Sequence, residues 1–229
     1  NPVFTFVAII TLALGIGANT AIFSLVNAVL LKPLPLPEAD RLVTIWEDLS
    51  VRGFPRSDVA IGTYNDWRSQ QSVFTDVAAV EWRALNLTGE GEPERVSGYS
   101  VTSNFFRVIG IQPALGRTFS ADEDKPQGPK VVILSFNLWQ RRFGGQPEIL
   151  NREILLNGEK YSVIGVMPKG FQFLASYAGI WTPAGFNQEQ LSDYDNHYIN
   201  VVARMKPGVT LDQATADIKT ITQRIVANH

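Results

Sequence analysis

The most prominent pattern in the chain is an apolar N-terminal segment without charge. Residues 3–31 are dominated by Val, Ile, Leu, Phe and Ala, and the first charged side chain is that of Lys32. A helix needs roughly 20 such residues to cross the ~30 Å hydrocarbon core of a bilayer. We therefore predict a transmembrane helix over residues 1–32 and a water-exposed domain after it. A signal peptide is the alternative, although its apolar core usually has only about 7–15 residues after a basic start.

The predicted span is longer than a bilayer requires. At about 1.5 Å per residue it would measure roughly 43 Å, so it must tilt or project from the bilayer. Small residues recur along it at helical spacing, which places them on one face where a neighbouring helix could approach closely. This candidate helix-packing face consists of Ala13, Gly17, Ala21, Ser24 and Ala28. Because the chain begins at Asn1 rather than at a Met, we expect it to be part of a longer protein.

Beyond the span, short alternating segments mix with helical ones. Prolines at positions 33, 35 and 37 indicate an extended connector over residues 33–37. Apolar and β-branched runs predict strands at residues 42–46, 77–87, 95–101, 131–134, 153–156, 161–166, 180–181 and 198–205. Helical patterns follow Thr63, Ser103, Ser135 and Thr210. Strands and helices therefore alternate irregularly, which is typical of the α+β class.

Capping and turn residues set the expected ends of these elements. Thr63 with Asp66, and Thr210 with Gln213, have the spacing of a capping box, in which two side chains satisfy each other's backbone amides. Ser103 and Ser135 are expected to cap the other two helices. The second of those helices should stop at Gly144-Gly145, and Asn157-Gly158 predicts a hairpin. In the last helix, Leu211, Ala214, Ile218, Ile221 and Ile225 should form one apolar stripe.

Composition narrows the classes of function. The chain has 229 residues, a formal net charge of −2 and no cysteine. Disulfides, thiolate catalysis and thiolate metal sites are therefore excluded. Acids and bases are interspersed, and no basic stripe suggests a nucleic-acid surface. We expect no nucleic-acid partner.

The residues that usually carry chemistry do not assemble into a recognisable site. The two histidines, His197 and His229, have no partner set with metal-ligand or triad spacing, and His197 most simply makes a structural hydrogen bond. The acidic run 122–124 lacks the spaced ligands of a calcium loop and is interpreted as a solvated loop. No nucleotide-binding P-loop and no serine-hydrolase elbow occurs. We predict no catalytic residue, no cofactor and no metal.

Several long motifs then resemble one family. Residues 15–31 (GIGANTAIFSLVNAVLL), 104–119 (NFFRVIGIQPALGRTF), 138–145 (LWQRRFGG), 163–168 (VIGVMP) and 197–208 (HYINVVARMKPG) carry the resemblance. Together they resemble the first span and the extracytoplasmic core domain of MacB-like (FtsX-like) ABC transporter permeases. The chain is most similar to the duplicated orphan permeases of acidobacterial type. The resemblance covers nearly the whole chain.

The resemblance implies an architecture and a function. Residues 38–110 and 190–229 would form a porter-like subdomain, and residues 111–189 an inserted sabre-like subdomain. The domain would lie on the periplasmic side of the bacterial inner membrane. An ABC ATPase subunit and a second permease copy would be its partners, and a periplasmic adaptor is a further candidate. ATP-driven motion would pass through the domain for efflux or export, a role known as mechanotransmission, and the chain itself would not be an enzyme.

Two alternatives remain open from the residues alone. A membrane-anchored sensor or ligand-binding ectodomain would also have an apolar N-terminal anchor and no catalytic residues. A membrane-anchored hydrolase would need two converging carboxylates of raised pKa, for which Glu81, Glu92, Asp193 and Asp195 are candidates. The aromatic residues Phe171, Phe173 and Tyr177 would form either an exposed contact loop or part of the core; core packing is preferred.

Overall fold

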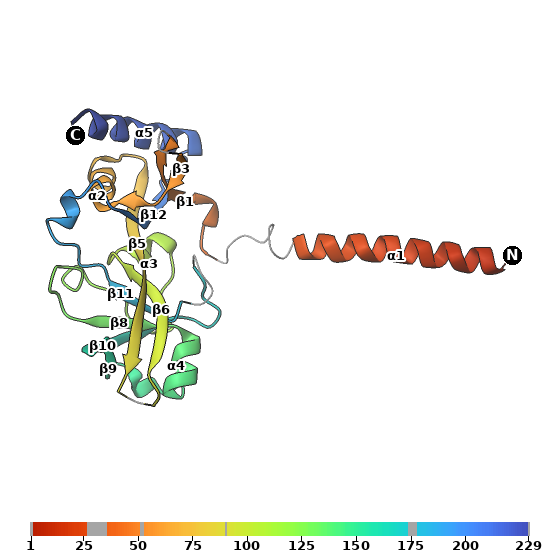
Figure 1. Cartoon of the computed structure of the whole chain (residues 1–229), viewed down its shortest axis with the longest axis horizontal. Coiled ribbons are helices and arrows are strands. Elements are labelled where there is room, and N and C mark those ends of the chain that lie inside the picture. The colour runs from red at the N-terminus through yellow and green to blue at the C-terminus, as the bar shows by residue number, and fades with distance from the viewer. Residues whose placement is uncertain (1, 27–35, 51–52, 90, 174–177, 229) are drawn as a thin grey trace. The chain divides into compact units, whose positions relative to one another are not determined.

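The computed structural model describes residues 2–26, 36–50, 53–89, 91–173 and 178–228. The chain divides into two compact units, residues 1–39 and residues 40–229, which are described separately. The first unit consists mainly of the helix α1, Pro2–Val26 (Figure 1). Within the described residues, we find no helix with the length and apolar character of a membrane span. Residues 1 and 27–32 of the predicted span and residues 33–35 of the predicted connector lie outside the described residues.

The second unit is a mixed α+β fold, as the sequence predicts. Its helices are α2 (Ile61–Gln70), α3 (Phe105–Ile109), α4 (Phe136–Phe143) and α5 (Leu211–Asn228), with 3-10 turns η2 (Ala39–Arg41), η4 (Pro147–Ile149) and η5 (Gln190–Ser192). Its strands are β1 (Leu42–Ile45), β2 (Glu47–Leu49), β3 (Phe54–Ser57), β4 (Val59–Ala60), β5 (Phe74–Thr88), β6 (Glu94–Val101), β7 (Leu115–Gly116), β8 (Val131–Leu134), β9 (Glu153–Leu156), β10 (Glu159–Val166), β11 (Ile180–Pro183) and β12 (His197–Met205).

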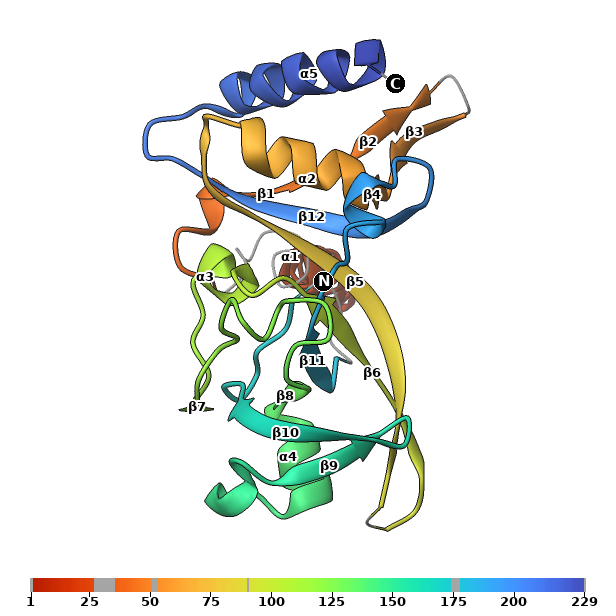
Figure 2. The ribbon, with the colours of Figure 1, turned by 90° about the vertical axis from the view of Figure 1, so that its left-hand side faces the viewer.

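Most strands join one twisted sheet. Its order is β1-β12-β5-β6-β11-β8-β10-β7, with β4 added beside β12 and β9 beside β10 and β5. The pairs β6–β11 and β8–β10 are parallel, and the other pairs are antiparallel. Strands β2 and β3 form a separate small ribbon. The longest strand, β5, runs from the part of the sheet under α2 to the part beside β9 (Figure 2).

Side chains on β5 and β12 point alternately to the two faces of the sheet, and different helices cover those two faces. Val77, Ala79, Val201 and Ala203 point to the face covered by α2 and α5, where they are fully buried. Arg204 points to the other face, and its Nε donates to the carbonyl of Val108 at the end of α3, at 2.7 Å. The sheet is therefore covered on one face by the two longer helices of this unit and on the other by α3.

Buried apolar residues form two core clusters. The first core cluster lies between the sheet and helices α2 and α5, and consists of Ile45, Val59, Ile61, Tyr64, Trp67, Phe74, Val77, Ala79, Phe186, Ile199, Val201, Ala203, Met205, Ala214, Ile218, Ile221 and Ile225. The second core cluster lies around α4 and the β9–β10 hairpin, and consists of Leu87, Val96, Val132, Leu134, Leu138, Trp139, Ile149, Ile154, Leu156, Val163, Val166 and Ile180.

Several predicted element ends are confirmed. The Ser135 hydroxyl accepts from the Leu138 amide at 3.1 Å and caps α4, which ends at Gly144 in the left-handed conformation. The predicted hairpin joins β9 to β10, with positive φ at both Asn157 and Gly158. The Thr210 amide donates to Gln213 and the Gln213 amide donates to the Thr210 hydroxyl, so this capping box also forms.

Three local predictions are wrong. Thr63 is not a cap, because α2 begins at Ile61 and Thr63 lies buried within the helix. There the Gly62 amide donates to the Asp193 carbonyl, so a distant loop satisfies the helix start. Ser103 does not cap α3, which begins at Phe105 after Asn104. Leu211 is 62 % exposed and departs from the buried stripe of α5.

Candidate functional site

The predicted helix-packing face is described only in part. Ala13 and Gly17 lie within α1, and a Cβ built on Gly17 would meet no atom within 4 Å. Ala21 and Ser24 lie on the same helix, but their side chains are outside the described residues, as is Ala28 altogether. The role of this face stays a prediction.

The acidic run 122–124 is solvated only in part: Asp122 is exposed, as predicted, whereas Glu123 and Asp124 make structural contacts. Glu123 is buried and accepts two hydrogen bonds from the Arg117 guanidinium, at 2.9 and 2.6 Å. The bonds from Arg117 hold the pKa of the Glu123 carboxyl below its usual value. Asp124 accepts from the amides of Ser103 and Gly185, at 2.6 and 2.9 Å, and so ties two distant loops together. Among the described residues, no group of three or more His, Asp or Glu side chains is placed to hold a metal ion.

His197 makes the structural contact that its position predicts. Its Nε2 lies 2.6 Å from Oε2 of Glu47, and its Nδ1 lies 2.8 Å from the carbonyl of Asp195. The Glu47 side chain is only 9 % exposed, and its other oxygen accepts from the amide of Ala60. This pair joins β2 to the start of β12. Both side chains make contacts that hold these strands in place.

Two of the four carboxylates considered for hydrolysis, Glu81 and Asp193, make other contacts. Glu81 pairs with Arg83 at 3.0 Å, and burial raises its pKa. Asp193 accepts from the side chain of Asn196, which lowers its pKa. Glu81 and Asp193 therefore do not supply the two raised pKa values that a hydrolytic pair requires.

The aromatic residues near position 171 contribute to the core where they are described. Phe173 is buried, with its ring centroid 5.2 Å from that of Phe105 in an edge-on arrangement. The Phe171 ring lies 5.5 Å from that of Trp181. Tyr177 lies outside the described residues. The preferred reading, core packing, is confirmed for Phe173.

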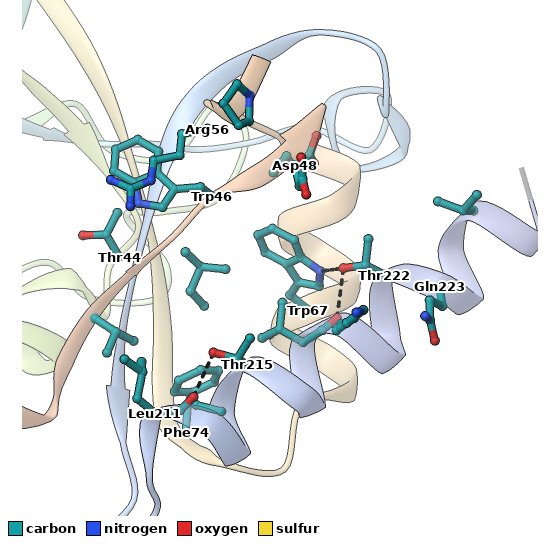
Figure 3. A pocket seen from close by; sticks show the side chains of 18 residues that line it. Thr44, Trp46, Asp48, Arg56, Trp67, Phe74, Leu211, Thr215, Thr222 and Gln223 are labelled. Atoms are coloured by element: carbon teal, nitrogen blue, oxygen red, sulfur yellow. Dashed lines mark hydrogen bonds between the residues drawn. The ribbon is translucent and has the colours of Figure 1, made fainter. Parts of the chain in front are cut away.

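A groove runs along α5 in the second unit. It has a volume of about 680 Å³ and lies between β1, the residues that follow it, and one face of α5 (Figure 3). Its floor contains Trp67 and Phe74, which belong to the first core cluster. On the side opposite α5, Figure 3 shows Thr44, Trp46 and Arg56. We call this feature the α5 groove.

The helix wall of the α5 groove follows the helical repeat. Leu211, Thr215, Ile218, Thr222 and Val226 occur at spacings of three or four residues and line it from one end of α5 to the other. The two threonine hydroxyls are turned back to the helix: Thr215 donates to the Leu211 carbonyl and Thr222 to the Ile218 carbonyl, at 2.8 and 2.9 Å. The helix wall therefore combines the apolar residues Leu211, Ile218 and Val226 with two threonines whose hydroxyls are bonded within the helix.

One polar contact crosses the floor of the α5 groove. The indole Nε1 of Trp67 donates to the Thr222 hydroxyl at 3.0 Å, which fixes α2 against α5. At the rim, Asp48 accepts from the Ser50 amide at 2.9 Å, and its bonds to Ser50 lower its pKa. The groove thus offers an apolar trough with sparse charge at its edge, and no arrangement of a nucleophile and a base.

The sequence did not predict the α5 groove. Its walls come from residues 43–56 and 211–226, which are far apart in the chain. The sequence predicted a strand at residues 42–46 and a helix after Thr210, but not that the two lie beside the same groove. A sequence pattern cannot show which helix will lie beside such a strand.

Comparison with known proteins identifies the family. The family model described as "MacB-like periplasmic core domain" matches residues 5–221. A curated relative from Pseudomonas syringae pv. tomato, named "Probable syringafactin export ATP-binding/permease protein SyfD", is 30% identical over 123 residues. Those residues are 53% of this chain and only 18% of that protein, so the chain spans a small part of its relative.

Solved structures share the fold at low identity. The periplasmic region of MacB from Actinobacillus actinomycetemcomitans matches with a TM-score of 0.61 and 16% identity, over 80% of this chain and 82% of that one. A domain of a putative permease protein from Porphyromonas gingivalis matches with a TM-score of 0.63 and 14% identity, over 82% and 86%.

The extracellular domain of the noncanonic ABC-type transporter YknZ from Gram-positive bacteria matches with a TM-score of 0.52 and 17% identity, over 77% of this chain and 86% of that one. At such identities the three structures support the fold alone, whereas the family model covers most of the sequence. The chain therefore belongs to the MacB-like periplasmic core domain family of ABC transporter permeases.

Proposed function

We propose that this chain is the extracytoplasmic core domain, with the first membrane span, of an ABC transporter permease that takes part in efflux or export. The observation that carries the proposal is the family match over residues 5–221, which includes both α1 and the α+β unit. The domain would lie on the periplasmic side of the bacterial inner membrane. An ATPase in another subunit or domain would supply the energy, and this chain would transmit the resulting motion.

The character of α1 supports its role as an anchor. Large apolar side chains are exposed around it, including Phe6, Leu12, Ile16 and Phe23. Its polar Thr20 donates its hydroxyl to the Ile16 carbonyl at 2.8 Å, which satisfies this group within the helix. Apolar contact on all sides and internal hydrogen bonding are the two conditions that a bilayer sets. The proposed span covers residues 1–32, and its small-residue face would pack on other spans of the permease.

The two core clusters suggest how the porter-like and sabre-like subdomains are built. The first core cluster would belong to the porter-like part and the second to the sabre-like part. Leu87 and Val96, on the far ends of β5 and β6, pack in the second cluster. We therefore propose that the subdomain boundary crosses these two strands and does not fall only near residues 110 and 190.

The continuous strands suggest how motion would pass through the domain. Because β5 contributes residues to both clusters and pairs with β6, a force applied to the first cluster would reach the second through covalent chain and strand hydrogen bonds. Mechanotransmission needs such a rigid element. A second permease copy, and in some systems a periplasmic adaptor, would complete the assembly.

Spin-label distance measurements would test the proposal. The absence of cysteine in this chain allows single labels at Asp212→Cys on α5 and at Glu148→Cys near the second core cluster, both exposed positions. The complete permease would be reconstituted in bilayers with its ATPase. We expect the distance between the two copies to differ between the nucleotide-free and ATP-bound states at one or both labels.

The control is an ATPase variant that binds ATP but does not close around it, for which the distances should stay at their nucleotide-free values. Identical distance distributions in all nucleotide states would contradict mechanotransmission. If no spin–spin interaction between two copies were detected with either label, the proposed dimer would be contradicted.

A further inference from the structure

The β2–β3 ribbon is a part of the second unit that lies outside the large sheet. The chain leaves the sheet after Ile45, forms the ribbon, and returns to the sheet at Val59 in β4. Within the described residues, the two strands of the ribbon pair only with each other (Figure 2). Apart from these two chain connections, the attachment of the ribbon to the sheet therefore depends on side-chain contacts.

Glu47 makes such a contact at the base of the ribbon, where it lies opposite Ser57. Its Oε1 accepts from the Ala60 amide at 3.3 Å, and its Oε2 lies 2.6 Å from Nε2 of His197. The side chain of Glu47 is only 9% exposed and that of His197 only 16%. One largely buried carboxylate therefore connects the ribbon to both β4 and β12.

Both ring nitrogens of His197 face hydrogen-bond acceptors. The Asp195 carbonyl lies 2.8 Å from Nδ1 and cannot donate, so Nδ1 carries a proton. A neutral imidazole has no second N–H, and its Nε2 would then direct a lone pair at the carboxylate of Glu47. A separation of 2.6 Å between Nε2 and Oε2 requires a proton between the two atoms. In this geometry the pair therefore holds one proton more than a neutral histidine beside an ionised carboxylate.

Further charged groups lie on the segments that surround the ring. They include Arg56, Asp58, Glu81, Arg83, Asp193 and Asp195. Glu81 pairs with Arg83 at 3.0 Å, and Asp193 accepts from the Asn196 side chain at 2.6 Å. Arg56, Asp58 and the side chain of Asp195 are exposed. Glu47 is thus the carboxylate that bonds to the ring and shares its proton.

We propose that His197 and Glu47 form a proton-dependent clasp, which fixes the base of the β2–β3 ribbon to the sheet and releases it at higher pH. When the shared proton passes to the solvent, the lone pair of Nε2 and the carboxylate repel each other and the contact opens. Glu47, Asp48, Pro55 and Arg56 also line the α5 groove, so release of the ribbon would loosen one wall of that groove. The clasp belongs to the domain itself and does not depend on the proposed transport function.

Hydrogen exchange with mass spectrometry would test the clasp in the complete permease, in bilayers and without nucleotide. Exchange would be compared at about pH 5 and about pH 8, the range in which histidine changes its charge, with labelling times scaled for the intrinsic effect of pH. We expect the protection of peptides from β2 and β3 to fall about tenfold at the higher pH, because a charge-assisted hydrogen bond is lost. Peptides from the β9–β10 hairpin should keep their protection. Equal protection of the ribbon at both pH values would overturn the proposal.

Two variants separate the clasp from other effects of pH. In Glu47→Gln, the amide can accept from Ala60 and donate to a neutral ring, so the contact no longer needs the extra proton. Its ribbon should be protected at least as well at the higher pH as at the lower one. Asp48→Asn removes an exposed carboxylate from the same strand and should keep the tenfold difference of the wild type. A Glu47→Gln protein with the same pH dependence as the wild type would overturn the proposal, whether or not ATP moves the domain.

Discussion

The two core clusters of residues 40–229 are closed in different ways. The second core cluster draws on the nearly continuous segment 85–180 and is closed by a capped helix and a tight hairpin. The first combines residues 43–79 with residues 184–225 and leaves the α5 groove open along one side. The difference shows that the part of the domain made from nearby residues is bounded by local elements, while the part made from distant segments has an exposed apolar surface.

The largest effect is expected from a cavity in the second core cluster. Leu156 is fully buried, and its replacement in Leu156→Ala should lower the free energy of unfolding by about 2–5 kcal/mol. Leu155, its neighbour on β9, points to the other side of the strand and is only half-buried. Leu155→Ala is therefore the matched control and should cost clearly less. Denaturant unfolding followed by circular dichroism would measure both.

The same variant tests whether the two clusters unfold together. Because β5 carries Phe74 in the first cluster and Leu87 in the second, we expect the amides of β10 and of β12 to lose protection in one step. Hydrogen exchange with mass spectrometry would follow both strands. Loss of protection confined to β10 would mean that the two clusters unfold independently. They would then be the cores of two separate domains.

A smaller effect is expected from the hydrogen bonds that hold the start of α3 against β5. Asn104 is buried; its amide nitrogen donates to Asp76 and to the Val77 carbonyl, at 2.6 and 2.8 Å, and its oxygen accepts from Thr102 at 2.7 Å. Asn104→Ala would remove these three hydrogen bonds from the interior and should cost about 2 kcal/mol. Asn137→Ala, at an exposed position on α4, should change stability by less than about 0.5 kcal/mol. Equal values for the two variants would contradict a structural role for the Asn104 contacts.

The smallest effect concerns pH and the Arg117–Glu123 pair. The pKa of Glu123 is lowered in the folded state, so the pair stabilises the fold above the unfolded pKa of about 4.3. This contribution is lost as the pH falls from there through the folded pKa. Because Arg117 is 55% exposed, we expect Glu123→Gln to cost only about 1 kcal/mol at pH 7.

Unfolding curves at several pH values would show the two proteins converging as the solution becomes more acidic. Asp122→Asn, which removes the exposed partner of Lys125, is the control and should change the pH profile much less. A constant difference between wild type and Glu123→Gln from pH 7 to pH 3 would show that the carboxylate charge is not the cause.

Local sequence signals predicted much of the fold, and long-range contacts explain the failures. Ser135, Gly144 and Asn157-Gly158 act on residues within a few positions, so their roles follow from sequence alone. Thr63 has the right spacing for a cap, but pairing of β4 with β12 and the bond from Gly62 to Asp193 start α2 earlier. Asn104 follows the predicted cap Ser103, but its side chain turns to β5 and makes no capping bond.

The candidate site could be predicted less well than the fold. The family motifs include Asn104–Phe119 and His197–Gly208, whose residues the fold uses for packing and strand pairing. The α5 groove depends on Trp46, Trp67 and Leu211 coming together from three separate segments. Sequence periodicity shows that each residue belongs to a strand or a helix, and it contains no information on which of these elements become neighbours.

The pairing of β1 with β12 also sets the order in which the domain can fold during synthesis. Residues 42–45 meet residues 201–204, so β1 leaves the ribosome long before its partner exists. At about 5–20 residues per second the wait is roughly 8 to 32 s. The segment 85–180 can assemble around its own hairpin in the meantime. A newly made chain therefore holds a short apolar strand without its partner for many seconds, during which chaperones and proteases have their best access to it.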